Sequence, residues 1–188
     1  RYIAMITGLT IVSAAAVTVA GVVDRYQLRR FDAFLNQDSN EKDLQQIVLQ
    51  VRFAKRAVSS GGFFGKGFLQ GPLTNGAFIP VQFSDFPFSA IGEQFGMIGG
   101  FVVLGLFAII LWRLWVISRL ARSRFDQLLI AGVFSLFLFQ IFQNIGMTLG
   151  LTPVSGLPLP FISYGGSHLV SSALMIGLAQ SIYMRRLR

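Results

Sequence analysis

Residues 59–97 read SSGGFFGKGFLQGPLTNGAFIPVQFSDFPFSAIGEQFGM, and the interpretation of the whole chain depends on this stretch. Seven glycines precede Gly96 within it, so its first half cannot form one regular helix. Its many phenylalanines are equally atypical of a flexible, solvated linker. The composition therefore predicts a structured segment that is not one continuous helix, and the rest of the chain forms a frame around it.

Two carboxylates stand out in this stretch, because Asp85 and Glu93 are the only acidic residues between Asp43 and Asp126. Asp85 lies among phenylalanines just before a long apolar run, where a carboxylate is costly to place. It could stabilise a helix start near Pro87, worth ~0.3–1 kcal/mol through the helix dipole, or act as a general base at a membrane surface. Glu93 is open to a binding role or to structural pairing with an arginine or a polar residue of a neighbouring span.

The composition of the whole chain indicates an integral membrane protein that is mostly helical. Of its 188 residues, 53% are hydrophobic and 13% are charged, against ~25% charged in soluble domains. The absence of cysteine and the single histidine exclude disulfides, thiolate chemistry and multi-histidine metal sites within this chain. The net charge is +8, and the basic residues lie beside apolar spans. This placement disfavours nucleic acid as a binding partner and favours anionic lipid or a phosphate-bearing substrate.

Four apolar stretches are long enough to cross a ~30 Å hydrocarbon core at ~1.5 Å per residue. These predicted spans are residues 3–23, 88–117, 128–151 and 167–183. Residues 24–87 form a large loop between the first two spans, and within it residues 41–58 have the pattern of an amphipathic helix lying in the membrane interface. Residues 152–166 hold three prolines and three glycines and predict a second loop. The predicted fold is an all-α integral membrane protein, a polytopic helical bundle with four transmembrane helices and a large extracytoplasmic loop.

The arginines of the short segments predict the orientation of the spans. They lie in residues 119–124 and at the C-terminus, and the positive-inside rule places both on the cytoplasmic side. Residues 24–87 and 152–166 then share the outer face, where they could build one site. The chain starts at Arg1 with an apolar span and without a signal peptide, so we expect it to be a piece of a longer protein.

Lys66 lies in the sequence GGFFGKG, which only partly matches a phosphate-binding loop. The spacing of a Walker motif and the following serine or threonine are missing, so ATP binding is not expected. Glycine amides with a lysine could still hold a pyrophosphate. The alternative is a loop lysine that reaches toward water along an apolar surface.

Polar side chains in the last two spans have structural and functional interpretations. Gln140, Gln143 and Asn144 share one face of a helix, an arrangement typical of hydrogen bonding between helices in lipid. His168 opens the fourth span and is interpreted mainly as a hydrogen-bonded interface residue. Ser163 and Tyr164 lie in a glycine-containing loop that permits close approach of a ligand. A triad of serine, histidine and aspartate is disfavoured because no nucleophile-elbow pattern is present.

Three motifs carry a family resemblance: SSGGFFGKGFLQG, IPVQFSDFPFSAIGEQFGMIGG and FQIFQNIGMTLGLTPVSGLPLPFISYGGSHL. They resemble the SEDS family (shape, elongation, division and sporulation), the RodA/FtsW-type membrane proteins, from about residue 26 to the end. The segment TNGAFIPVQFSDF is more similar to the RodA branch. The resemblance implies a helical protein of roughly ten spans, the last four of which this chain supplies. A separated fragment is therefore expected to be inactive.

The resemblance also implies an activity, a location and partners. Members are peptidoglycan glycosyltransferases that polymerise lipid II at the outer face of the bacterial cytoplasmic (inner) membrane, with a class B penicillin-binding protein, in wall elongation and cell shape. Asp85 matches the family's essential catalytic aspartate. An inverting transfer is expected, and a divalent cation such as Mg²⁺ or Mn²⁺ could assist. The candidate substrate-binding residues are Lys66, Gln82, Ser84, Glu93, Ser163, Tyr164 and His168.

Two other functional classes stay open. A transporter that flips lipid II would also use intramembrane polar groups, although it would place them near the membrane midplane rather than in an outer loop. A non-catalytic scaffold of the wall-synthesis complex would not depend on Asp85. The functional classes differ in the residues on which they depend. A glycosyltransferase depends on Asp85 in the loop, whereas a transporter would depend on the cluster of Gln140, Gln143 and Asn144 in the third span.

Overall fold

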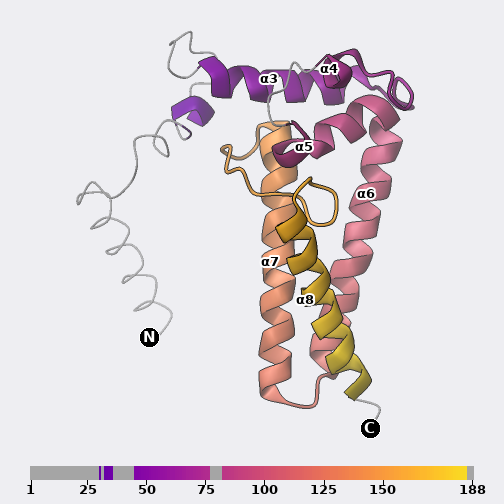
Figure 1. Cartoon of the computed structure of the whole chain (residues 1–188), viewed down its shortest axis with the longest axis vertical. Coiled ribbons are helices and arrows are strands. Elements are labelled where there is room, and N and C mark those ends of the chain that lie inside the picture. The colour runs from indigo at the N-terminus through magenta and orange to yellow at the C-terminus, as the bar shows by residue number, and fades with distance from the viewer. Residues whose placement is uncertain (1–29, 31, 36–44, 77–81, 186–188) are drawn as a thin grey trace, which may run out of the picture. The chain divides into compact units, whose positions relative to one another are not determined.

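The computed structural model describes residue 30 and residues 32–35, 45–76 and 82–185 (Figure 1). Within these ranges the chain is helical and contains no strand, which agrees with the predicted all-α class. The helices are α3 (Gln45–Ser60), α4 (Pro72–Asn75), α5 (Gln82–Asp85), α6 (Pro87–Leu120), α7 (Arg124–Leu149) and α8 (Gly166–Arg185). The first predicted span, residues 3–23, lies outside the described residues.

The chain divides into two compact units, residues 1–48 and 49–188. In the described part of the first unit, Ala33 and Val48 are buried and Ile47 packs against them. The second unit contains all of the candidate site residues. Of the amphipathic helix predicted at residues 41–58, the described part is helical as α3, which continues to Ser60 and leads into the glycine-rich segment, residues 61–71; residues 41–44 lie outside the described residues.

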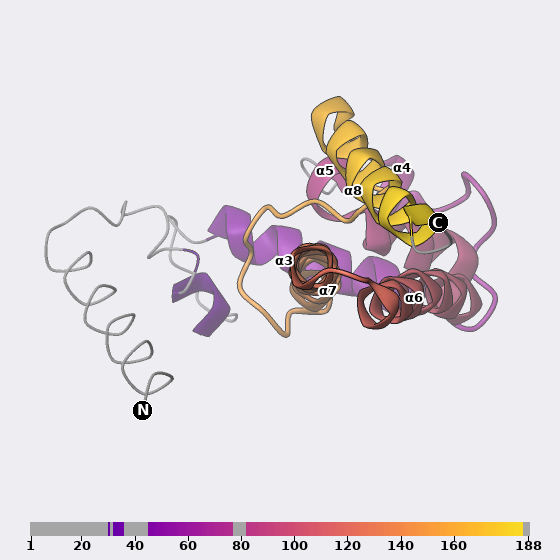
Figure 2. The same ribbon diagram turned by 90° about the horizontal axis from the view of Figure 1, so that it is seen from below.

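In the second unit, α6 and α7 run side by side in opposite directions, and α8 packs against both of them (Figures 1 and 2). Pro87 begins α6, where its missing N–H has no intrahelical partner to lose. Ser123 caps α7 by accepting a hydrogen bond from the Asp126 N–H at 3.1 Å, and Gly150 ends it in the left-handed conformation. The core between the helices is aliphatic and aromatic, with Leu114, Ile130 and Phe137 almost completely buried.

Two of the described helices, α6 and α7, are long and apolar enough to cross a membrane. Only 17% of the most apolar part of α6 and 39% of that of α7 is buried inside the structure, so both present wide apolar surfaces. The exposed aromatics Phe101, Trp112 and Phe142 lie on these surfaces. The helix α8 is shorter and contains the polar residues His168 and Gln180. It does not meet the same length and hydropathy test as α6 and α7, so its role as a membrane span stays a prediction.

A kink at Gly96 divides α6, where the apolar run predicted one uninterrupted span at residues 88–117. Gly96 has φ 65° and ψ −158°, a backbone region that is essentially restricted to glycine. The main-chain groups freed by the kink bond to the glycine-rich segment. Lys66 N–H and Gly67 N–H donate to the carbonyls of Glu93 and Gln94 at 3.0 Å each. In return, Met97 N–H donates to Gly62 O at 2.9 Å and Ile98 N–H to Phe63 O at 3.3 Å.

The reciprocal backbone hydrogen bonds around Gly96 hold the glycine-rich segment against the first part of α6. The loop that follows α7 lies at the same end of the α6–α7 pair, because α7 returns to the level at which α6 began (Figure 1). Tyr164 N–H from this loop donates to Phe83 O in α5 at 2.9 Å. The two segments expected to build one site therefore meet at one end of the bundle.

Candidate functional site

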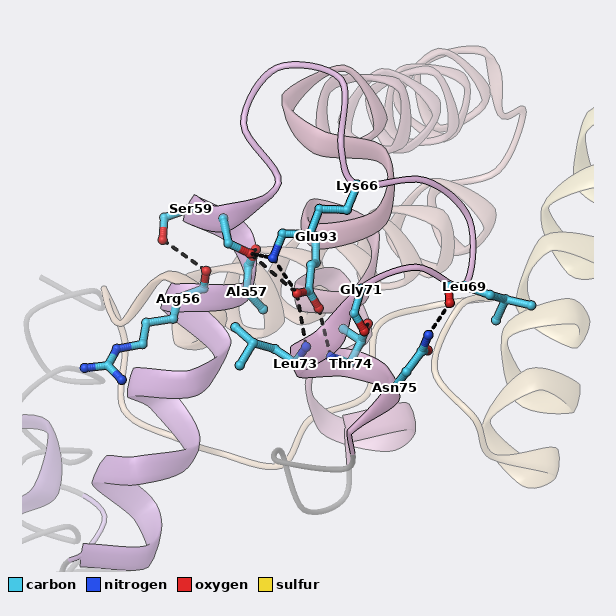
Figure 3. A network of polar contacts seen from close by, with 11 residues as sticks. Arg56, Ala57, Ser59, Lys66, Leu69, Gly71, Leu73, Thr74, Asn75 and Glu93 are labelled. Carbon is cyan, nitrogen blue, oxygen red and sulfur yellow. Dashed lines mark hydrogen bonds and ion pairs between the residues drawn. The ribbon is translucent and has the colours of Figure 1, made fainter.

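The carboxylate of Glu93 in α6 makes polar contacts with the glycine-rich segment and with α4. Its side chain is completely buried, and its Oε1 is 3.0 Å from Lys66 Nζ (Figure 3). Lys66 Nζ also donates to Ser60 Oγ at 2.8 Å, and that hydroxyl lies 3.5 Å from Glu93 Oε1. The lysine is partly open to solvent, with 29% of its side chain exposed. The structural pairing considered for Glu93 is thus observed, with a loop lysine as the partner instead of a residue on a neighbouring span.

The same carboxylate caps α4 from outside that helix. Gly71 is the N-cap of α4 and has no side chain with which to bond the first amides. Glu93 accepts from Leu73 N–H at 3.2 Å through Oε1 and from Thr74 N–H at 2.8 Å through Oε2 (Figure 3). A Cβ atom at Gly71 would come within 2.7 Å of Glu93 Oε2, so the glycine permits this close approach.

Asp85 is the last residue of α5 and is half-buried at the end of the bundle where the two loops meet. Ser84 Oγ donates to Asp85 Oδ1 at 2.8 Å. The Asp85 main-chain carbonyl accepts from Asn144 Nδ2 of α7 at 3.0 Å. The adjacent Phe86 is buried and leads into Pro87 at the start of α6. The backbone of Asp85 is therefore held by α7, while its carboxylate stays partly accessible.

The polar face of α7 organises the loop that follows this helix. Asn144 Nδ2 donates to Leu157 O at 2.8 Å as well as to Asp85, so one amide joins the loop to α5. Gln143 Nε2 donates to Pro153 O at 2.9 Å. The hydrogen-bonding interpretation of this cluster is confirmed for these two residues, with one difference: their partners are loop and α5 carbonyls rather than side chains of another helix.

Replacing Asn144 with alanine is expected to destabilise the fold by at least about 2 kcal/mol, because the Asp85 and Leu157 carbonyls both lose their donor. The measurement is the thermal unfolding midpoint of the purified protein in detergent. Thr148→Val is the matched control, since Thr148 is equally buried and its hydroxyl donates within α7, to Asn144 O. Equal shifts for both variants would contradict the linking role of Asn144.

The remaining predicted site residues lie in different surroundings. Gln82 is buried in α5, and Tyr164 is 82% exposed beside that helix. Ser163 is buried, and its hydroxyl accepts from Leu159 N–H at 2.7 Å, which fixes the loop. His168 is half-buried in the first turn of α8, and its buried Nε2 atom has no hydrogen-bond partner among the described residues, so the hydrogen bond predicted for this side chain is not observed at Nε2.

The structure thus brings the candidates together in two groups. Ser84, Asp85 and Tyr164 gather at α5, whereas Lys66 pairs with the buried Glu93, whose carboxylate caps α4. Among the described residues, no group of three acidic or histidine side chains could hold a metal ion, so they offer no evident cluster for the expected divalent cation. Sequence reasoning missed Asn144 as the holder of Asp85 and Glu93 as the cap of α4. The Gly71–Pro72 pair was the available signal for a helix start without a side-chain cap.

Comparisons with known proteins agree with one another. The model of the FtsW/RodA/SpoVE family, described as cell cycle proteins, matches residues 1–187. The chain is 36% identical over 166 residues to the peptidoglycan glycosyltransferase RodA of Treponema pallidum, covering 88% of this chain and 38% of that protein. It is 37% identical over 177 residues to the probable peptidoglycan glycosyltransferase FtsW of Trichlorobacter lovleyi, covering 94% and 45%. It is 34% identical over 162 residues to the peptidoglycan glycosyltransferase MrdB of Escherichia coli K12, covering 86% and 43%.

A solved structure gives the same answer at the level of the fold. The chain matches one chain of a structure described as the structural coordination of polymerization and crosslinking by a peptidoglycan synthase complex, with a TM-score of 0.73 and 26% identity. The match covers 96% of this chain and 48% of that one. This chain spans less than half the length of the three curated relatives described above. The family model, the relatives and the fold together show that the chain belongs to the FtsW/RodA/SpoVE family, the SEDS proteins.

Proposed function

We propose that this chain is part of a peptidoglycan glycosyltransferase that polymerises lipid II into glycan strands. The observation that carries the proposal is a half-buried carboxylate, Asp85, held at the loop end of the α6–α7 pair in a chain whose relatives are named peptidoglycan glycosyltransferases. A loop-end carboxylate suits chemistry at the membrane surface better than a path through the membrane.

The chemistry needs one base and one stabilised leaving group. A sugar hydroxyl of the acceptor attacks the anomeric carbon of the donor, and Asp85 takes the hydroxyl proton. The bond to the polyprenyl pyrophosphate breaks in the same displacement, so the anomeric centre inverts. The pyrophosphate leaves with its own negative charge and requires cationic groups rather than a protein acid. The candidates for this role are Arg52 and Lys55 of α3, Lys66 of the glycine-rich segment, and a divalent cation.

The setting that we propose for this reaction is supported by the family membership and by the two apolar helices. We place the protein in the bacterial cytoplasmic (inner) membrane as a multi-pass protein, with Asp85 at the outer face and lipid II as its substrate. The solved relative belongs to a complex that combines polymerization with crosslinking. This supports a class B penicillin-binding protein as the partner, and the role that we propose is in wall elongation and cell shape.

The test is polymerisation of lipid II by the purified full-length protein together with its penicillin-binding partner. The partner's transpeptidase is blocked, so that any product is uncrosslinked glycan. Vesicles loaded with labelled lipid II measure movement across the bilayer in parallel. We expect polymer without protein-dependent lipid movement. Lipid movement without polymer would overturn the proposal in favour of a transporter, and neither activity would favour a scaffold.

A further inference from the structure

A single buried carboxylate joins four segments of the second unit. Glu93 in α6 contacts Ser60 at the end of α3, Lys66 in the glycine-rich segment and the first amides of α4. Lys66 is held twice by the same residue, because its backbone N–H donates to Glu93 O at 3.0 Å and its side chain pairs with Oε1 at 3.0 Å. Together with the backbone hydrogen bonds of Gly67, Met97 and Ile98, this double contact fixes the register of the segment against α6.

We propose that Glu93 and Lys66 are positioning residues for Asp85, an inference that rests on the proposed function. Neither residue needs to touch the substrate. Their contact fixes α4 to α6, and α5 with Asp85 lies between these two helices in the chain. Asp85 precedes Pro87, the first residue of α6, by two positions, and Glu93 lies in the second turn of that helix.

The contacts of Asp85 explain why its carboxylate depends on this arrangement. The side-chain contact described above comes from Ser84, its own neighbour in α5, so this hydrogen bond moves with α5 and cannot fix the direction of the carboxylate. Its backbone is held from α7 by Asn144. The helix α5 is also bonded by Tyr164 N–H at Phe83 O, and it packs against α6, the helix that carries Glu93. A general base must lie within hydrogen-bond reach of the hydroxyl it deprotonates, so a small shift of α5 lowers the rate.

The two ends of the contact are not interchangeable. Glu93 accepts from two main-chain amides as well as from the ammonium group, whereas Lys66 supplies only donors. A charge-exchanged variant, Glu93→Lys with Lys66→Glu, would present an ammonium group to the amides of Leu73 and Thr74. We therefore expect the exchange to fail to restore activity, although it keeps one positive and one negative group.

The kinetic test compares Glu93→Gln, Lys66→Met and Lys66→Arg in the full-length protein with its partner. We expect the first two variants to lower kcat for polymerisation by at least about tenfold, equal to 1.4 kcal/mol of barrier. The KM for lipid II should stay within about twofold, because no substrate contact is removed. Lys66→Arg should retain most of the activity. Asp126→Asn, an acid-to-amide change in the first turn of α7 at the other end of the bundle, is the matched control.

The double variant Glu93→Gln/Lys66→Met tests whether the two residues act as one unit. We expect the kcat of the double variant to equal that of the less active single variant and not to fall below it, since both changes break the same contact. A raised KM with unchanged kcat for Lys66→Met would overturn the proposal and assign Lys66 to substrate binding. Unchanged kcat in both folded single variants would overturn it as well. If Glu93→Gln fails to fold, the partly exposed Lys66 still provides the test.

Amide hydrogen exchange supplies a readout that does not depend on catalysis. In Lys66→Met we expect faster exchange at Thr74 and also at Phe86 and Tyr164, whose amides bond to α5 carbonyls. Faster amide hydrogen exchange at Thr74 alone, with unchanged rates at Phe86 and Tyr164, would mean that the contact stabilises only α4. This result would overturn the positioning role. A wild-type protein that shows the expected exchange but makes no glycan would instead refute the proposed function.

Discussion

Replacing Asp85 with asparagine is expected to lower the rate of glycan polymerisation by about 10²–10⁴-fold, the contribution of a well-placed general base. Asparagine has nearly the same volume and can still accept the Ser84 hydroxyl through its side-chain oxygen. Its amide cannot take a proton from the attacking sugar hydroxyl. The backbone bond from Asn144 is unaffected, so the fold should be retained.

The measurement for Asp85→Asn is polymer formed from lipid II by the full-length protein with its partner, the transpeptidase being blocked. Asp126→Asn is again the control, because Asp126 lies in the first turn of α7, far along the bundle from α5. Its rate should match the wild type. Unfolding midpoints of both variants must match the wild type for the comparison to be valid. Polymerisation by folded Asp85→Asn at the wild-type rate would refute the assignment of the base.

Replacing Gly96 with alanine is expected to cause the largest loss of stability among the changes considered. The backbone conformation at Gly96 costs a non-glycine residue about 1–3 kcal/mol. The new methyl group would also lie 2.7 Å from Phe63 O and 2.8 Å from Gly62 O, and overpacking of this kind costs about 1–3 kcal/mol. Because the clashing atoms are backbone, they cannot turn away. The hydrogen bonds that join the glycine-rich segment to α6 should break with it.

The measurement for Gly96→Ala is the thermal unfolding midpoint in detergent, together with the amount of protein recovered from membranes. Gly105→Ala is the matched control on the same helix, because a Cβ there meets nothing within 4 Å. It should be neutral or slightly stabilising, since alanine favours a helix over glycine by about 0.5–1 kcal/mol. A Gly96→Ala protein as stable as the Gly105→Ala control would show that the kink is not required.

Several features could be predicted from sequence because they depend on local composition. The boundaries of α6 and α7 follow from long apolar runs between a proline and basic turns, and residues 88–117 and 128–151 were expected close to the observed Pro87–Leu120 and Arg124–Leu149. Residues 61–67, at the start of the glycine-rich segment, form turns and irregular structure, as the glycines predicted. The motifs around Asp85 and Tyr164 predicted the family. Each of these signals is contained within a few neighbouring residues.

The hydrogen-bond and ion-pair partners of the polar side chains could not be predicted from local sequence. Nothing local distinguishes Lys66 as a phosphate ligand from Lys66 as the partner of Glu93, because the two residues are separated by 27 positions and meet only through the fold. Asn144 likewise reaches Asp85 across 59 positions. The kink at Gly96 was also missed, since four other glycines occur in the same helix without non-helical angles. Only its exchange of hydrogen bonds with residues 62–67 distinguishes it.

The sequence by itself determined the class of protein, the long apolar helices, the irregular glycine-rich segment and the identity of Asp85 as the candidate base. These properties depend on hydrophobicity, glycine content and short motifs, which act over a few residues. The tertiary structure alone decided that Glu93 caps α4, that Lys66 is its ion partner and that Asn144 holds Asp85. A buried polar group must find a partner wherever the folded chain presents one, and that choice is made by packing between distant segments.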